Sequence, residues 1–130
     1  LKEFLQHLHN DGVRMCITTA AEQSLVESAL ERCGILDYFS DIFTCTSVGA
    51  GKDEPLIYRE ALKFLGTHRN NTLVFEDSLH ALETAKNDGF HTAAVYDSSE
   101  ENQEEICKLA DCRIKDFGAL EEFYNFIKTL

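Results

Sequence analysis

The sequence is short of basic residues, and it lacks long apolar runs. Its 130 residues contain 12 Lys and Arg against 23 Asp and Glu, which gives a formal net charge of −11. This balance argues against nonspecific nucleic-acid binding, which requires a basic face. No apolar run approaches the ~18 residues of a membrane-spanning helix, and no signal peptide is recognisable. We therefore expect neither a nucleic-acid nor a membrane partner, although a phosphorylated substrate is compatible with this charge.

The cysteines form no pattern that indicates a metal or redox site. They are Cys16, Cys33, Cys45, Cys107 and Cys112, an odd number without Cys-x-x-Cys spacing. Three of them lie in apolar surroundings, where a buried free thiol is the ordinary interpretation. Free thiols persist in reducing compartments, so the sequence predicts a cytoplasmic protein.

The first residues already follow a helical pattern. Leu1, Phe4, Leu5 and Leu8 repeat at the spacing of an amphipathic helix, without an initiator Met or a capping residue before them. We therefore expect this chain to be part of a longer protein.

Segments with strand and helix patterns alternate along the chain. Strands are predicted at 13–19, 41–48, 71–77, 91–96 and 112–114. Helices are predicted at 1–9, 21–33, 56–66, 78–89 and 117–127, and an acidic turn and helix at 97–110. Such alternation predicts an α/β fold, a three-layer Rossmann-like parallel sheet with helices on both faces. Residues 1–130 are expected to form one domain. The acidic stretch 97–105 is interpreted as a solvated helix start rather than a binding tail.

Polar side chains follow the carboxyl ends of three predicted strands, where ligands bind in such sheets. They are Thr18 and Thr19, Lys52, and the pair Glu76 and Asp77.

The carboxylate pair indicates a cation site. Neighbouring strand residues point to opposite faces, so one of Glu76 and Asp77 would be an inner ligand and the other an outer partner. Adjacent carboxylates near a core are costly unless a cation offsets them. Oxygen ligands with open positions suit Mg²⁺, which keeps its waters and takes one or two carboxylates plus substrate phosphate. The alternative is that Asp77 or Ser78 only caps the following helix.

The other two signals are weaker. Lys52 lies in a glycine loop, GAGKD (49–53), which fails the nucleotide-binding phosphate-loop pattern at Thr46 and at Asp53. Thr19 and the backbone N–H groups after it are suited to cradle a phosphate. The alternatives are a solvated lysine and a threonine that only caps a helix.

These segments follow one another in the order of the motifs of the haloacid dehalogenase superfamily of phosphatases and phosphomutases, which the chain resembles. GVRMCITTA (12–20) resembles its second motif, GKDEPLIYREALKFLG (51–66) its third, and LVFEDSLHALETAKNDGF (73–90) its fourth. The resemblance runs along nearly the whole chain, and the fourth motif is its most specific part.

The resemblance implies a role for each candidate residue. The Thr19 hydroxyl, helped by the Ala20 backbone N–H, would hold the transferred phosphate. Lys52 would neutralise the phosphate and the nucleophile. Asp77 would bind Mg²⁺, and Glu76 would assist from the outer shell.

Three residues depart from the family pattern. Asp53 stands where the family usually has Pro, Leu56 where it has Asp, and Ala81 where Gly is common. An acid beside Lys52 weakens the effective charge of the lysine.

The family's first motif, D-x-D-x-[TV], which carries the nucleophilic Asp and the acid/base Asp, is absent from the sequence. The resemblance places its strand in the middle of the sheet, between the strands that end at Thr19 and at Asp77. It also places a helical cap domain between the first and second motifs. We therefore expect a C-terminal core fragment that is catalytically inactive alone. Its open strand edges would be completed by the missing N-terminal segment or by a second copy.

The sequence thus predicts a magnesium-dependent hydrolase. The parent protein would cleave a small phosphorylated metabolite through an aspartyl-phosphate intermediate. The alternatives are a phosphomutase and a degenerate, non-catalytic phosphate-binding domain. A phosphoacceptor receiver domain ranks last, because Lys52 precedes the acids here.

Overall fold

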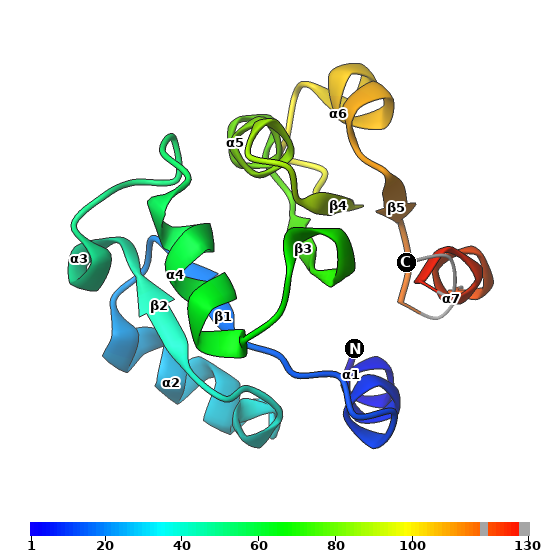
Figure 1. The fold of residues 1–130 in the computed structure, drawn as a ribbon. Coiled ribbons are helices and arrows are strands. Elements are labelled where there is room, and N and C mark those ends of the chain that lie inside the picture. The colour runs from blue at the N-terminus through cyan, green and yellow to red at the C-terminus, as the bar shows by residue number, and fades with distance from the viewer. Residues whose placement is uncertain (118–119, 128–130) are drawn as a thin grey trace. The chain divides into compact units, whose positions relative to one another are not determined.

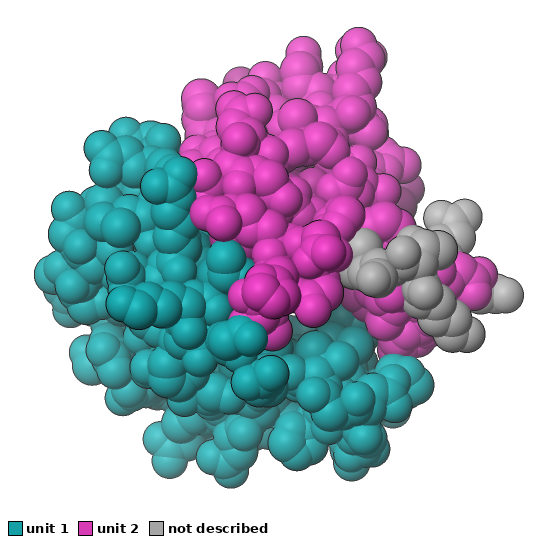
Figure 2. Space-filling view, in the orientation of Figure 1, with its two compact units in different colours: residues 1–66 teal, residues 67–130 magenta. Residues whose placement is uncertain are grey.

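A computed structural model describes residues 1–117 and 120–127, and it divides the chain into two compact units. Unit 1 comprises residues 1–66 and unit 2 comprises residues 67–130 (Figures 1 and 2). Each unit is described by itself. The expectation of a single domain over residues 1–130 stays a prediction.

Unit 1 combines a two-stranded parallel sheet with helices. Its elements are α1 (Lys2–Asn10), β1 (Ile17–Thr19), α2 (Gln23–Arg32), the 3₁₀ helix η1 (Leu36–Tyr38), β2 (Ile42–Thr44), α3 (Cys45–Val48) and α4 (Leu56–Leu65). β1 pairs with β2 from Ile17 opposite Ile42 to Thr19 opposite Thr44. α4 buries Ile57 and Tyr58 almost completely, and Gly66 ends the helix with a φ of 70° that favours glycine.

Unit 2 contains a three-stranded parallel sheet. Its elements are η2 (Arg69–Asn71), β3 (Leu73–Glu76), α5 (Leu79–Asn87), β4 (His91–Val95), α6 (Gln103–Leu109), β5 (Cys112–Ile114) and α7 (Glu121–Ile127). The strand order is β3-β4-β5, so β4 is paired on both sides (Figure 1). Its residues 92–94 are buried, as expected for a central parallel strand.

Helices cover both faces of the sheet in unit 2. Ala94 of β4 packs in one buried cluster with Leu82 of α5 and Ile106 of α6. Phe75 of β3 instead lies against Phe123 of α7, with ring centroids 5.6 Å apart. The α/β fold with parallel strands is therefore confirmed. No helix within residues 1–117 and 120–127 is long and apolar enough to cross a bilayer.

Some predicted element boundaries are wrong. The strand expected over 41–48 ends at Thr44, because Thr44 and Ser47 form a reciprocal capping box that starts α3. The acidic turn and helix expected over 97–110 are found, with the helix α6 beginning at Gln103. The last helix begins at Glu121 rather than at residue 117, and residues 118–119 lie outside the described part of the chain.

In the described part of the chain, every strand except β4 has one edge without a partner. β1 pairs only with β2, and β3 pairs only with β4. An unpaired edge presents backbone N–H and C=O groups that a further strand is able to bind.

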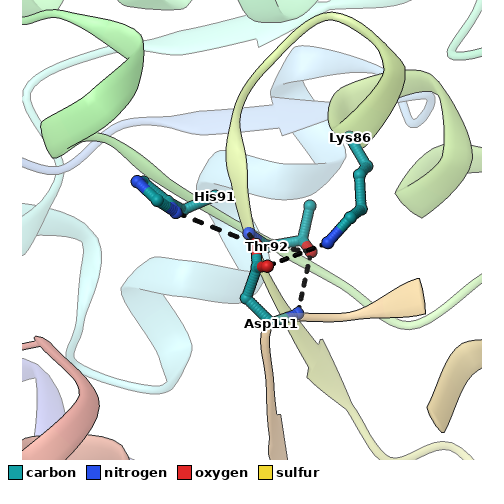
Figure 3. A network of polar contacts seen from close by, with 4 residues as sticks. All are labelled: Lys86, His91, Thr92 and Asp111. Atoms are coloured by element: carbon teal, nitrogen blue, oxygen red, sulfur yellow. Dashed lines mark hydrogen bonds and ion pairs between the residues drawn. The ribbon is translucent and has the colours of Figure 1, made fainter. Parts of the chain in front are cut away.

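A polar network joins β4 to the segment before β5 (Figure 3). The Asp111 carboxylate accepts hydrogen bonds from the buried Thr92 N–H at 2.8 Å and from the Lys86 ammonium at 2.8 Å. The Asp111 N–H donates to the Thr92 carbonyl at 3.1 Å, and His91 Nδ1 lies 3.9 Å from the carboxylate. One side chain thus connects α5, β4 and the start of β5.

The network lowers the pKa of Asp111. Partial burial raises this pKa, but the hydrogen bonds from Lys86 and from the Thr92 N–H and the positive charge nearby outweigh the burial. A carboxyl group whose pKa is lower in the folded chain adds stability above its unfolded pKa of about 3.9. That contribution disappears as the pH falls through the lower, folded value.

We predict that Asp111→Ala destabilises the chain by about 1–3 kcal/mol at pH 7, because the buried Thr92 N–H loses its acceptor. Urea unfolding at pH 7 measures this difference, and Glu104→Ala, in an exposed position, serves as the matched control. The part of the effect that comes from charge should shrink below about pH 4. Equal unfolding midpoints for the two variants would contradict this role of Asp111.

Candidate functional site

Thr19 lies at the carboxyl end of β1. Its Oγ1 accepts a hydrogen bond from the Ala21 N–H at 3.1 Å, so the residue shapes the turn before α2. The N-cap residue of α2 is Glu22, which makes no side-chain capping bond. Because the bond to Ala21 uses Oγ1 as an acceptor, the hydroxyl hydrogen of Thr19 can donate to another group. Ala20 follows Thr19 directly and is exposed.

Lys52 lies in the loop between α3 and α4, in the same unit as Thr19. It is half-buried, and the four-residue helix α3 separates it from the end of β2. The Asp53 carboxylate folds against the Gly51 backbone, since a Cβ added at Gly51 would stand 2.8 Å from Asp53 Oδ1. The structure thus holds the acid beside Lys52 against the loop backbone.

Glu76 and Asp77 follow one another at the carboxyl end of β3, and their environments differ. Glu76, the last residue of the strand, is buried with 7% of its surface exposed, whereas Asp77 is exposed. The N-cap of α5 is Ser78, which accepts a hydrogen bond from the Ala81 N–H at 3.4 Å. Of the two predicted capping candidates, Ser78 therefore takes the role, and the Asp77 carboxylate is left for another partner.

Its neighbour in the structure is Asp97, whose side chain lies close enough to Asp77 for the two carboxyl groups to interact. The sequence pattern assigned Asp97 to a solvated helix start and did not indicate this contact. A signal was present, because Asp97 follows the apolar segment HTAAVY (91–96) much as Asp77 follows the apolar segment of β3.

These carboxylates are compatible with a magnesium ion. No group of three or more His, Cys, Asp or Glu side chains that could hold a metal is found within residues 1–117 and 120–127. Mg²⁺ needs only one or two carboxylates, however, because waters and substrate oxygens complete its shell. Asp77, with Glu76 and Asp97 next to it, provides that donor type.

The predicted site residues form two groups. Thr19, Ala20 and Lys52 belong to unit 1, and Glu76 and Asp77 belong to unit 2. Thr19 and Asp77 each lie at or just past the carboxyl end of a parallel strand in their own unit. That the two groups share one site stays a prediction.

Comparison with known proteins identifies the family. The model of haloacid dehalogenase-like hydrolases matches residues 1–95, which include the three motif-like segments. The chain belongs to this family. The resemblance that its motifs indicated is thus confirmed.

Curated relatives of the chain are named as phosphatases. It is 31% identical to the pyrophosphatase PpaX of Oceanobacillus iheyensis over 70% of the chain and 42% of that protein. It is 27% identical to the validoxylamine A 7'-phosphate phosphatase of Streptomyces hygroscopicus subsp. limoneus, over 88% of the chain and 52% of that protein. The chain spans about half the length of these curated relatives.

Solved haloacid dehalogenase structures show the same fold. An HAD phosphatase from Thermococcus onnurineus superposes with a TM-score of 0.80 at 24% identity, covering 94% of this chain and 55% of that one. CbbY from Rhodobacter sphaeroides, solved in complex with phosphate, gives a TM-score of 0.80 at 24% identity, over 92% of this chain and 53% of that one. The HAD Rossmann-like fold is therefore confirmed for the part that the chain covers.

We predict that Thr19→Val lowers the free energy of unfolding by about 0.5–1.5 kcal/mol, because the Ala21 N–H loses its acceptor. Thr19→Ser keeps the acceptor and should stay close to the original value. Thr18→Val is the matched control in the same strand, since no hydrogen bond of the Thr18 hydroxyl is seen in the described part of the chain. If urea unfolding gives the same loss for both Val variants, Thr19 does not hold the turn.

Proposed function

We propose that the protein to which this chain belongs is a magnesium-dependent phosphatase that acts on a small phosphorylated metabolite. The observation that carries this proposal is the position of Glu76 and Asp77. They stand at the carboxyl end of β3, within the residues that the family model matches. This is the edge at which parallel α/β sheets bind ligands.

The phosphate would be held from unit 1. The Thr19 hydroxyl donates to a phosphate oxygen while its own oxygen accepts from the Ala21 N–H, which fixes the side chain. The Ala20 backbone N–H adds a second donor. Lys52 offsets the negative charge of the phosphate and of the attacking carboxylate. Asp53, held against Gly51, reduces the net positive charge of this loop.

The metal would be held from unit 2. Asp77 would ligate Mg²⁺ and Glu76, buried behind it, would assist from the outer shell. A bound Mg²⁺ supplies neutralisation of the charge on the transferring phosphoryl group. The exposed Asp77 carboxylate is spared from capping by Ser78, which supports this assignment.

The nucleophile would come from outside these residues. In the proposed reaction an Asp carboxylate attacks phosphorus and the alcohol leaves, which forms an aspartyl phosphate that water then hydrolyses. The sequence contains no D-x-D-x-[TV] segment. The edges of β1 and β3, unpaired in the described part of the chain, support a further strand that would carry this segment. It would come from an N-terminal part of the same protein, or a second copy would complete the sheet.

The relatives narrow the substrate only to phosphorylated compounds. The curated matches include a pyrophosphatase, a validoxylamine phosphate phosphatase and a ribulose-1,5-bisphosphate 5-phosphatase. A phosphomutase is the second candidate, because a structure named as a putative β-phosphoglucomutase, from Thermotoga maritima, shares the fold with a TM-score of 0.80 at 26% identity. A non-catalytic phosphate-binding domain is a further candidate, because it would explain why Asp53 and Leu56 depart from the family pattern. We retain the cytoplasm as the proposed location.

We predict that the purified 130-residue chain does not hydrolyse p-nitrophenyl phosphate in the presence of Mg²⁺, because it lacks a carboxylate nucleophile at the site. A continuous assay at 405 nm measures release of p-nitrophenol, and denaturing mass spectrometry confirms that a single polypeptide is present. Turnover that falls in the Asp77→Asn variant would show that the chain is a complete catalyst.

We predict that Lys52→Met weakens binding of inorganic phosphate roughly tenfold, because a charge-assisted contact worth about 1.5–3 kcal/mol is lost. Broadening of the phosphorus-31 NMR signal during titration with Mg²⁺ present measures this affinity. Lys63→Met is the matched control, since it removes the same charge from an exposed position on α4. If both variants bind phosphate equally, Lys52 does not contact the phosphate.

A further inference from the structure

Asp97 shares the site edge of unit 2 with Asp77. β3 and β4 are parallel neighbours, with Glu76 opposite Ala94. Asp77 is the first residue after β3, and Asp97 is the second residue after the end of β4 at Val95. Two carboxylates from separate strands thus emerge at the same end of the sheet.

Asp97 is held in place by its surroundings. Its Oδ1 accepts hydrogen bonds from the Ser99 N–H at 2.9 Å and from the Ser99 hydroxyl at 2.8 Å. Its carbonyl accepts from Gln103 Nε2 at 2.8 Å. The preceding residue, Tyr96, donates its N–H to the Ile114 carbonyl of β5 at 2.9 Å. The carboxylate is therefore oriented by its turn and by β5.

A helix start does not account for Asp97. α6 begins at Gln103 after the N-cap Asn102, so Asp97 lies outside the first turn, where the helix dipole acts. The Asp97 side chain also contacts the Asp77 carboxyl. Two carboxyl groups in contact repel each other unless a proton or a cation lies between them.

The charge of the Asp97 carboxylate adds to that of Asp77, because both residues follow neighbouring parallel strands at the same edge of the sheet. An anion fixed beside Asp77 raises the local affinity for a divalent cation.

We propose that Asp97 is a positioning residue of the cation site. With a cation between the two side chains, Asp97 would hold the Asp77 carboxylate in place, and it adds a second negative charge to the cation's surroundings. The proposal rests on the proposed function, because it deepens the assignment of Asp77 as a metal ligand. Ser99 acts on the cation site indirectly, because its N–H and its hydroxyl orient the Asp97 carboxylate.

Titration of the 130-residue chain with Mn²⁺, which also prefers carboxylate and water ligands, tests this proposal. Isothermal titration calorimetry and electron paramagnetic resonance of free Mn²⁺ both measure the affinity without any turnover. We expect Asp77→Asn to abolish site binding and Asp97→Asn to weaken it about tenfold. Ser99→Ala should weaken Mn²⁺ binding about threefold. Asp97→Glu should weaken it less than Asp97→Asn does.

Glu101→Gln is the matched control, since it removes one charge from an exposed position four residues along. Circular dichroism checks that each variant is folded. If Asp97→Asn does not fold, Ser99→Ala and Asp97→Glu still change the orientation of this carboxylate.

The outcomes distinguish the role of Asp97 from the metal site itself. If Asp77→Asn abolishes binding but Asp97→Asn matches Glu101→Gln or binds more tightly, the role of Asp97 is overturned and the proposed metal ligand stands. If Asp97→Asn does not fold, that role is overturned when Ser99→Ala and Asp97→Glu both match Glu101→Gln. If the chain binds no Mn²⁺, or if Asp77→Asn leaves binding unchanged, the proposed metal site and the role of Asp97 both fail.

Discussion

The parallel ladder between β3 and β4 is the interaction on which the candidate site of unit 2 depends. It fixes Glu76 opposite Ala94, so the residues after both strands emerge at one edge. Burial of β4 between two neighbours and under helices on both faces makes this register costly to change, since a slip of one residue would reverse every side chain. The contact between Asp77 and Asp97 follows from that register.

Carboxylates at the two ends of the sheet meet opposite conditions. At the amino end, Asp111 receives Lys86 and the Thr92 N–H, and its charge stabilises the fold. At the carboxyl end, Asp77 contacts another acid, and Ser78 takes the capping role. The charge of Asp111 is balanced by Lys86, whereas two neighbouring acids such as Asp77 and Asp97 would be stabilised by an added cation. On the proposed function, the carboxyl end of the sheet would therefore be the end that binds the cation.

The sequence predicted what depends on periodicity and on local motifs. The alternation of strands and helices, the placement of Thr19 and of Glu76–Asp77 at strand ends, and the family follow from such patterns. It failed where a side chain competes with the backbone. Thr44 and Ser47 stop a strand by capping the helix that follows it. The partner of Asp97 is 20 positions away across a strand pair, a distance that a local pattern does not reveal.

The unpaired edges of β1 and β3 bear on both the stability of the fold and the proposed reaction. Each edge presents backbone groups with no ladder partner in the described part of the chain, and an apolar edge of this kind favours pairing with another strand. The family resemblance implies a further strand that carries the nucleophilic Asp. The same segment would therefore complete the sheet and supply the attacking carboxylate. On this proposal, completion of a sheet and gain of activity would be a single event, because the strand that pairs with an open edge would also carry the nucleophile.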